Sequence, residues 1–511
     1  MRYKPKNIPT ANFFEAGRAS PRAFPLQVPR LEIGDAAQEN VPLEVSYDQH
    51  FDLSFRNHKT TDLGQYLNAT KGIYLRGANF PDGGELFLTR MRESVGKGTE
   101  IIMVPKRSLL LIRLGADAVR VEAVVINGPE FFFDGWEPEF IRGGFRLALK
   151  DFPTTHDLRT SSRLHRKDSI ATGTVVLTRL DGNSIEPEEA LQAIAHLFRF
   201  FSFVRGAYCG FGHINGFDSE GTMAFSYLGF TKHDQFNCTT GWYDIAQVKS
   251  LPELYDLYST AVAKIEDTFP ILRAIEFYRA SNILRETSLE MAVVASHSAL
   301  ETIAPHVLST RSGMSKDEIE KLKGFHAKTR AVAKFVNITC DPLQNLSALQ
   351  NRKSAENGID AYQLLGKFRN AIVHQSEKFP YTCNELDEVW NFSQWLCEVL
   401  IFYFLRYRGK MKDRRGHQGG ARGSQLFLYR SLPRLFTRKL HRPKPLRARP
   451  LPSPFEPLVL RPLQQFPLLE RWVEVHKGHD LRLAGAFVEV EAAELAGVLQ
   501  PRAADDFGER H

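Results

Sequence analysis

Arg369, Asn370 and His374 are the residues of this sequence whose types and spacing are best suited to chemistry. Histidine titrates near neutral pH and can act as a base or an acid, whereas arginine stays charged and can hold a phosphate through two N–H groups. Asparagine can orient a phosphate or the histidine by hydrogen bonding. RNA is cleaved without a metal when a base activates the 2′-hydroxyl, an acid protonates the 5′-oxygen and a cation stabilises the phosphate. The three residue types fit that chemistry.

The helix expected to carry these residues, 357–376, points their side chains in different directions. Phe368 and Ile372 are four residues apart and predict a side that faces a core. Asn370 and His374 are also four apart and share another side. At ~100° per residue, Arg369 and His374 point ~140° apart on an ideal helix. Both can act on one phosphate if the arginine curls round, if the helix ends before His374, or if a two-fold dimer forms one site from two chains.

The segment 250–408 has helical periodicity and predicts a compact all-α bundle. Pro252 and Pro270 suit helix starts, and Thr287 with Glu290 fits a capping box. The last helix is apolar on most of its surface and is expected to be central. The expected helices are 252–269, 271–284, 287–309, 315–337, 357–376 and 384–408.

Residues 41–245 predict an antiparallel β-rich domain, because short alternating segments lie between turn sequences. This pattern is typical of a sandwich or a barrel. A helix is expected at 187–203, with Ser184 as its cap and Pro187 in its first turn. The expected strands are 43–47, 51–55, 72–75, 84–88, 100–104, 109–114, 119–126, 145–149 and 173–177.

The segment 205–230 is rich in glycine and aromatic residues. Its glycines match neither GxGxxG nor a Walker A spacing, and no Lys-Ser/Thr follows them. Strands with tight turns are therefore the better interpretation, with His213 as a hydrogen-bonded structural histidine. Recognition of a ligand by this segment is an alternative.

The charge of the chain is unevenly placed. The 511 residues, 43% of them hydrophobic, predict several domains with sizeable cores and a net charge of +7. Residues 406–449 hold 15 Lys and Arg against one acidic residue, Asp413, so the remainder of the chain is net negative. A general nucleic-acid-binding surface over the folded body is thus not indicated.

Both ends of the chain differ in composition from its middle. Residues 1–40 are Pro-rich and are expected to be irregular, with two short strands at most. Residues 409–511 predict a basic Pro/Arg-rich tail that is largely flexible. That tail could bind RNA through its arginines, remain a solvated extension, or result from an extended reading frame.

Cysteine usage and hydropathy indicate the cellular compartment in which the protein is expected. The five cysteines have no close pair and no zinc-ligand spacing, which predicts reduced thiols in a cytoplasmic protein. No apolar stretch follows the basic N-terminus, so no secretory signal is expected. The longest apolar run, 395–405, is shorter than the ~20 residues of a membrane span. No metal, nucleotide or redox cofactor is indicated, and no membrane partner.

Residues 369–374 resemble the RNxxxH signature of HEPN domains, and their place on the penultimate helix of a bundle fits that family. The helix around 296–301 is similar to the Apea-like branch, whose members often carry a β-rich N-terminal domain. The resemblance covers about 250–408. It implies a metal-independent endoribonuclease, usually a homodimer through the bundle, in bacterial antiviral defence, abortive infection or toxin-like growth arrest. It also implies Arg369 and His374 as the catalytic pair, Asn370 as their polar companion and Glu301 as an acid facing them, although Glu301 could instead form a salt bridge to Arg369.

Two functions are compatible with the sequence. The first is an endoribonuclease that acts on RNA and is restrained by its N-terminal domain until an unknown ligand or protein triggers it. The second is a catalytically silent HEPN module that binds RNA or a protein, with the β domain sensing a ligand. The presence of both Arg369 and His374 favours the first.

Overall fold

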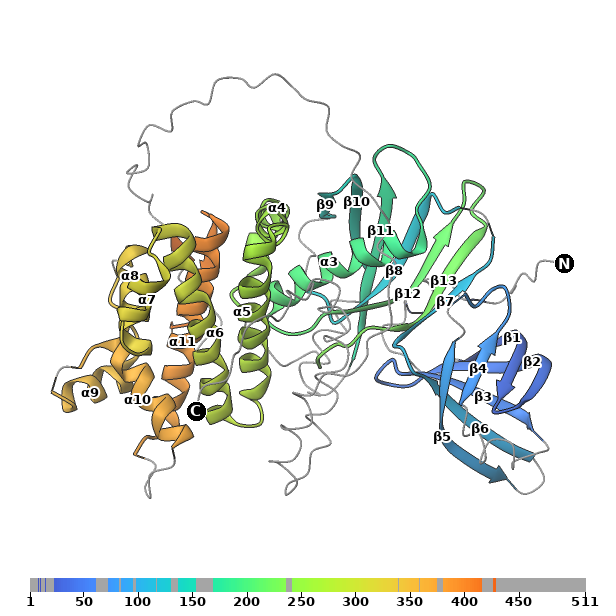
Figure 1. Cartoon of the computed structure of the whole chain (residues 1–511), viewed down its shortest axis with the longest axis horizontal. Coiled ribbons are helices and arrows are strands. Elements are labelled where there is room, and N and C mark those ends of the chain that lie inside the picture. Colours follow the sequence, from blue (N-terminus) through green and yellow to red (C-terminus); the bar gives the residue numbers. More distant parts are fainter. Residues whose placement is uncertain are drawn as a thin grey trace, which may run out of the picture. The chain divides into compact units, whose positions relative to one another are not determined.

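A computed structural model describes residues 23–60, 72–81, 84–94, 98–115, 117–129, 137–152, 169–235, 241–338, 340–357, 359–374, 380–415 and 426–428, together with residues 8, 10 and 14. It is an α+β multidomain chain in which an N-terminal antiparallel β region precedes a helical region, as the sequence predicts. Figure 1 shows both regions.

Six antiparallel strands close into a barrel in the order β1-β2-β3-β6-β5-β4. Strand β1 lies in the segment that was expected to be irregular, and β2 begins there. Pro25 and Pro29 interrupt the strand-like composition of β1, which explains why at most short strands, and none of this length, were expected there. The strands are β1 (Ala23–Ile33), β2 (Ala36–Tyr47), β3 (Leu53–Thr60), β4 (Ile73–Arg76), β5 (Glu85–Ser94) and β6 (Gly98–Pro105).

A second, seven-stranded antiparallel sheet has the order β7-β13-β12-β8-β11-β10-β9. The glycine-rich segment forms β12 and β13, as predicted, and His213 is buried in β12 with a hydrogen bond to the hydroxyl of Tyr47 at 3.2 Å. The strands are β7 (Leu109–Arg113), β8 (Arg120–Ile126), β9 (Glu139–Arg142), β10 (Phe145–Asp151), β11 (Ala171–Arg179), β12 (Gly210–Phe217) and β13 (Met223–Phe230).

Helix α3 (Pro187–Arg205) packs against this sheet and shares its core (Figure 1). Its cap differs from the prediction: Glu186, not Ser184, is the N-cap residue, and it forms a capping box with Glu189. Pro187 stands in the first turn, as predicted.

The helical region is a bundle in which α11 is almost entirely buried, which confirms the prediction that the last helix is central (Figure 1). Its helices are α4 (Leu251–Val262), α5 (Ile265–Leu284), α6 (Leu289–Val307), α7 (Lys316–Lys321), α8 (Phe325–Phe335), α9 (Ser347–Ala355), α10 (Ala361–Val373) and α11 (Cys383–Leu405).

Several helix boundaries differ from the predictions. Pro270 lies inside α5, because that helix begins after Lys264 with an acidic first turn. Ser288, not Thr287, caps α6 by accepting a hydrogen bond from the Met291 backbone N–H. The expected helix 315–337 is divided into α7 and α8 by Gly324, whose φ of 81° is a left-handed conformation that helices do not contain. Helix α9 was not predicted.

The folded part of the chain continues beyond residue 408, which corrects the start of the expected tail. A short strand, β14 (Lys410–Lys412), pairs with β15 (Leu426–Leu428), and Arg414 and Arg415 are only 5% and 1% exposed. They are buried because carboxylates of Glu398 and Asp413 neutralise them. Residues 416–425 and 429–511 of the expected tail lie outside the described residues. Among the described residues, no helix is long and apolar enough to cross a membrane.

Candidate functional site

Helix α10 is fixed at its start and along its buried side. Asp360 and Gln363 form a capping box at its N-terminus. Phe368 is fully buried, and its ring stacks on that of Tyr381 with centroids 3.7 Å apart. The predicted core-facing side is therefore present, with Leu364 buried one turn earlier. The opposite side of the helix carries the residues that sequence reasoning selected.

Helix α10 ends directly before the predicted histidine. The helix ends at Val373, and His374 is its C-cap residue, with φ −102° and ψ 14°. The His374 backbone N–H donates to the carbonyl of Asn370 at 2.9 Å, and the His374 side chain is exposed. Arg369 donates from Nη1 to Oδ1 of Asn370 at 3.2 Å. One of the conditions derived from helix geometry, an early helix end, is thus met.

Glu301 lies on α6 with its side chain 50% exposed. Within the described residues its carboxylate lies close to the ring of His297, whose Nδ1 is 3.7 Å from Oε1. Interaction with His297 is the largest cause that lowers the pKa of Glu301, and the positive charges of Arg369 and Lys328 lower it further, against an opposing effect of burial. The structure therefore brings Glu301 into the field of Arg369, while its close contact in the described part of the chain is with the ring of His297.

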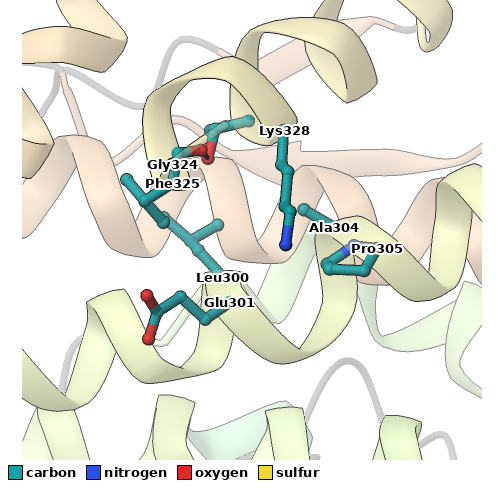
Figure 2. A pocket seen from close by; sticks show the side chains of 8 residues that line it. Leu300, Glu301, Ala304, Pro305, Gly324, Phe325 and Lys328 are labelled. Atoms are coloured by element: carbon teal, nitrogen blue, oxygen red, sulfur yellow. Dashed lines mark hydrogen bonds between the residues drawn. The ribbon is translucent and has the colours of Figure 1, made fainter. Parts of the chain in front are cut away.

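A pocket of about 300 Å³ adjoins Glu301 between α6 and α8. Figure 2 shows Glu301 on α6 and Lys328 on α8 at different sides of this pocket. The lining residues are Leu300, Glu301, Ala304, Pro305, Gly324, Phe325, Lys328 and Thr329. We call this cavity the α6–α8 pocket.

Sequence reasoning did not select Lys328, Phe325 or His297 as site residues. Lys328 belongs to no motif, and its approach to α6 depends on the break at Gly324, which divides the expected helix. His297 lies four residues before Glu301, a spacing that places the two on one side of α6 and is the one available signal.

Metal binding has no candidate site in the part of the chain that the structure describes. No group of three or more His, Cys, Asp or Glu side chains there could hold a metal ion. Four cysteines, Cys209, Cys340, Cys383 and Cys397, are free, and Cys238 lies outside the described residues.

The bundle and the seven-stranded sheet can be compared with known families. Two YopA domain models match this chain. Residues 126–237 match the YopA central domain, and residues 266–421 match the YopA C-terminal domain. No curated protein and no solved structure matches.

These matches correct the expected family. The segment with the RNxxxH residues is similar to the YopA C-terminal domain, and the segment before it to the YopA central domain, so the HEPN assignment, Apea-like branch included, is wrong. The physical reason is that the resemblance rested on a few residues at helical spacing, and such residues recur on unrelated helices.

The YopA C-terminal match covers most of the bundle. It begins within α5 and extends to residue 421, past β14 and past the buried Arg414 and Arg415. All four residues selected from the sequence, Arg369, Asn370, His374 and Glu301, lie within it.

Proposed function

We propose that the protein is a metal-independent endoribonuclease with its active site at the C-terminal end of α10. The observation that supports this proposal is the end of the helix at Val373, which leaves His374 as an exposed C-cap residue four positions after Asn370, whose side chain accepts a hydrogen bond from Arg369. A cytoplasmic role in antiviral defence or toxin-like growth arrest is part of the same proposal.

The proposed reaction uses the side chains as follows. Arg369 binds the non-bridging phosphate oxygens through its N–H groups, and Asn370 keeps the guanidinium in place through its hydrogen bond at 3.2 Å. An unprotonated His374 takes the proton of the 2′-hydroxyl, whose oxygen attacks phosphorus. The bond to the 5′-oxygen breaks, this oxygen receives a proton from an acid, and a 2′,3′-cyclic phosphate results.

A second copy of the chain would supply that acid. A two-fold dimer through the end of α10 would place two histidines at one phosphate, one as base and one as acid. Val373, next to His374, is 45% exposed and gives this surface an apolar residue that a partner could cover. The β region remains the proposed sensor of the unknown trigger, which raises a basal rate of cleavage that the purified protein already shows.

Cleavage of total RNA in EDTA tests the activity. We expect the parent protein to cleave, and the Arg369→Ala and His374→Ala variants to lose about 10²-fold or more of the rate. His50→Ala, in an exposed turn of the barrel, and Lys334→Ala, on the exposed side of α8, are matched controls that should cleave like the parent. Cleavage by either active-site variant at the parent rate would contradict the proposal.

Mixing the parent with His374→Ala tests the dimer. If the shared site needs His374 from both chains, a mixed dimer lacks either the base or the acid, and an equal mixture should keep about a quarter of the activity of the same amount of parent, that of the remaining parent homodimers. Val373→Asp should weaken the dimer in light scattering and lower cleavage with it. An active parent that is monomeric at the assay concentration would exclude the shared site.

One observation favours a second candidate, a catalytically silent module that binds RNA or a protein. Arg369 acts on the pKa of Glu301, so part of its charge is balanced within the chain and is not free for a phosphate. Absence of cleavage in every condition, with RNA binding that Arg369→Ala weakens, would select this candidate.

A further inference from the structure

The α6–α8 pocket has no role in the reaction proposed above, yet its walls suit a flat, partly polar ligand. Leu300, Ala304 and Pro305 give it an apolar floor on α6. Phe325 and Lys328 belong to α8 on the other side, as Figure 2 shows. A volume of about 300 Å³ is at the lower limit of the usual range for small-molecule pockets.

One wall of the pocket is aromatic and already stacked. The ring of Phe325 lies on that of His297, with centroids 3.5 Å apart and an angle of 29° between the planes. The His297 side chain is 5% exposed, and both its ring nitrogens lack a hydrogen-bond partner among the described residues. Unpaired bases of RNA bind by stacking on such aromatic side chains.

Two opposite charges stand apart along the pocket. The Lys328 side chain extends from α8 towards Ala304 and Pro305, while the Glu301 carboxylate lies beyond Leu300 (Figure 2). A ligand that satisfies both must present donors at one end and acceptors at the other. The interaction with His297, and after it the positive charges of Arg369 and Lys328, lower the pKa of Glu301 and favour its ionised carboxylate, which only accepts hydrogen bonds.

Guanine has this pattern. Its N1–H and 2-amino group are neighbouring donors that match a carboxylate, and its O6 and N7 are acceptors that lysine commonly reads. We propose that the α6–α8 pocket is a guanine subsite, in which Glu301 accepts from N1–H and the 2-amino group and Lys328 donates to O6 or N7. This inference rests on the proposed function, because Arg369 next to Glu301 is taken to hold the adjoining phosphate.

The other bases match the hydrogen-bonding groups of Glu301 and Lys328 less well than guanine does. Cytosine and adenine each present one amino group to the carboxylate, and the ring nitrogen beside that group is an acceptor that would repel it. Uracil offers a single N–H. The subsite therefore predicts cleavage next to guanosine in preference to the other nucleosides.

Binding of single nucleotides to the full-length protein tests the subsite without depending on cleavage. Calorimetric titration with the 3′-monophosphates of guanosine, inosine, adenosine and cytidine should give the tightest binding for guanosine. Adenosine and cytidine should bind about tenfold more weakly or worse. The nucleotide of inosine, which lacks the 2-amino group, should bind more weakly than that of guanosine and more tightly than those of adenosine and cytidine. Equal affinity for guanosine and adenosine would overturn the proposal.

Variants identify the side chains. Glu301→Gln and Lys328→Met should each reduce the preference for guanosine over adenosine about tenfold. Glu320→Gln and Lys334→Met, exposed changes on α7 and on α8, are the matched controls and should keep it. Circular dichroism spectra show whether each variant is folded, and the panel on the parent protein remains decisive if one is not.

The two proposals fail in different ways. Guanosine preference in binding without any RNA cleavage supports the subsite and sinks the nuclease. RNA cleavage with no base preference in binding or in the products supports the nuclease and sinks the subsite.

Discussion

Arg414 and Glu398 form an ion pair in the interior of the bundle. Nε of Arg414 is 2.6 Å from Oε1 of Glu398, and their side chains are 2% and 0% exposed. Nη2 of Arg414 also donates to Asn282 at 2.8 Å, and the Tyr278 hydroxyl donates to Glu398 at 2.7 Å. Burial raises the pKa of Glu398, and the charge of Arg414 opposes that rise. Each charge therefore depends on the other for its place in the core.

This pair gives a double-mutant prediction. Arg414→Met leaves a buried carboxylate without its cation, and Glu398→Leu leaves a buried guanidinium, so each should lower the free energy of unfolding by about 3–5 kcal/mol. The double variant removes both charges, so its loss of unfolding free energy should be smaller than the sum of the losses in the two single variants. Urea unfolding of the four proteins measures this coupling. Additive losses would contradict a direct interaction.

Sequence reasoning finds residues of this kind only when a local pattern marks them. Arg369, Asn370 and His374 lie within six positions, so helix periodicity alone predicted which of them share a side. Arg414 lies in a basic, glycine-rich stretch and resembles a solvated tail, although its partner Asn282 is 132 positions earlier. Lys328 reaches the α6–α8 pocket by the same kind of long-range contact, which no spacing indicates.

At the level of elements, periodicity predicted types better than ends. Every strand of the barrel except β1, and most of the helices, were predicted, because alternation and the 3.6-residue repeat follow directly from which side is buried. The break at Gly324 and the start of α5 before Pro270 were not, because a helix end depends on capping contacts and backbone angles that composition does not fix. The family was mispredicted for the related reason that a helix can carry the same few residues in different folds.

Helix α3 carries a pH dependence that can be measured. His196 is half-buried against Tyr255 and Tyr258, and its Nε2 is 3.0 Å from the Ser259 hydroxyl. Burial is the largest cause that lowers the pKa of His196 to about 3, and the charges of Arg142 and Arg199 add to it. An unfolded histidine has a pKa of about 6.5, so between these values the unfolded chain binds more protons than the folded one. Stability from His196 is thus complete above pH ~6.5 and falls as the pH is lowered towards 3.

The test is urea unfolding at pH 7 and pH 5. The parent should be less stable at pH 5, and His196→Gln, which keeps a polar group near Ser259 but does not titrate, should lose less between the two values. His233, whose pKa burial also lowers, contributes in the same direction, so part of the dependence should remain. An unchanged pH dependence in His196→Gln would show that its titration does not affect stability.

At the level of the whole molecule, the two hydrophobic cores group the elements differently from the domains that the composition of the sequence predicts. One hydrophobic cluster joins the seven-stranded sheet, α3 and the bundle, across the change of composition near residues 245–250. Trp242 links them: its ring is 5.5 Å from that of Phe203 on α3 and 4.7 Å from that of Phe402 on α11. The barrel belongs to a second cluster, together with parts of β7, β8 and β13. Composition reveals where periodicity changes, but it carries no information on which buried faces meet.

A shared core predicts that the sheet and the bundle unfold together. Trp242 is fully buried, so Trp242→Ala should lower the free energy of unfolding by about 3–5 kcal/mol. The loss should affect both the sheet and the bundle. Hydrogen exchange followed by mass spectrometry should therefore show faster exchange in β12 and in α11 alike. Phe55→Ala, in the barrel cluster, is the matched control and should speed exchange in β3 and β6 more than in α11. Protection of α11 that stays at the parent level in Trp242→Ala would show that the bundle is stable without the sheet, and the sensing role proposed for the β region would then need a route other than this core.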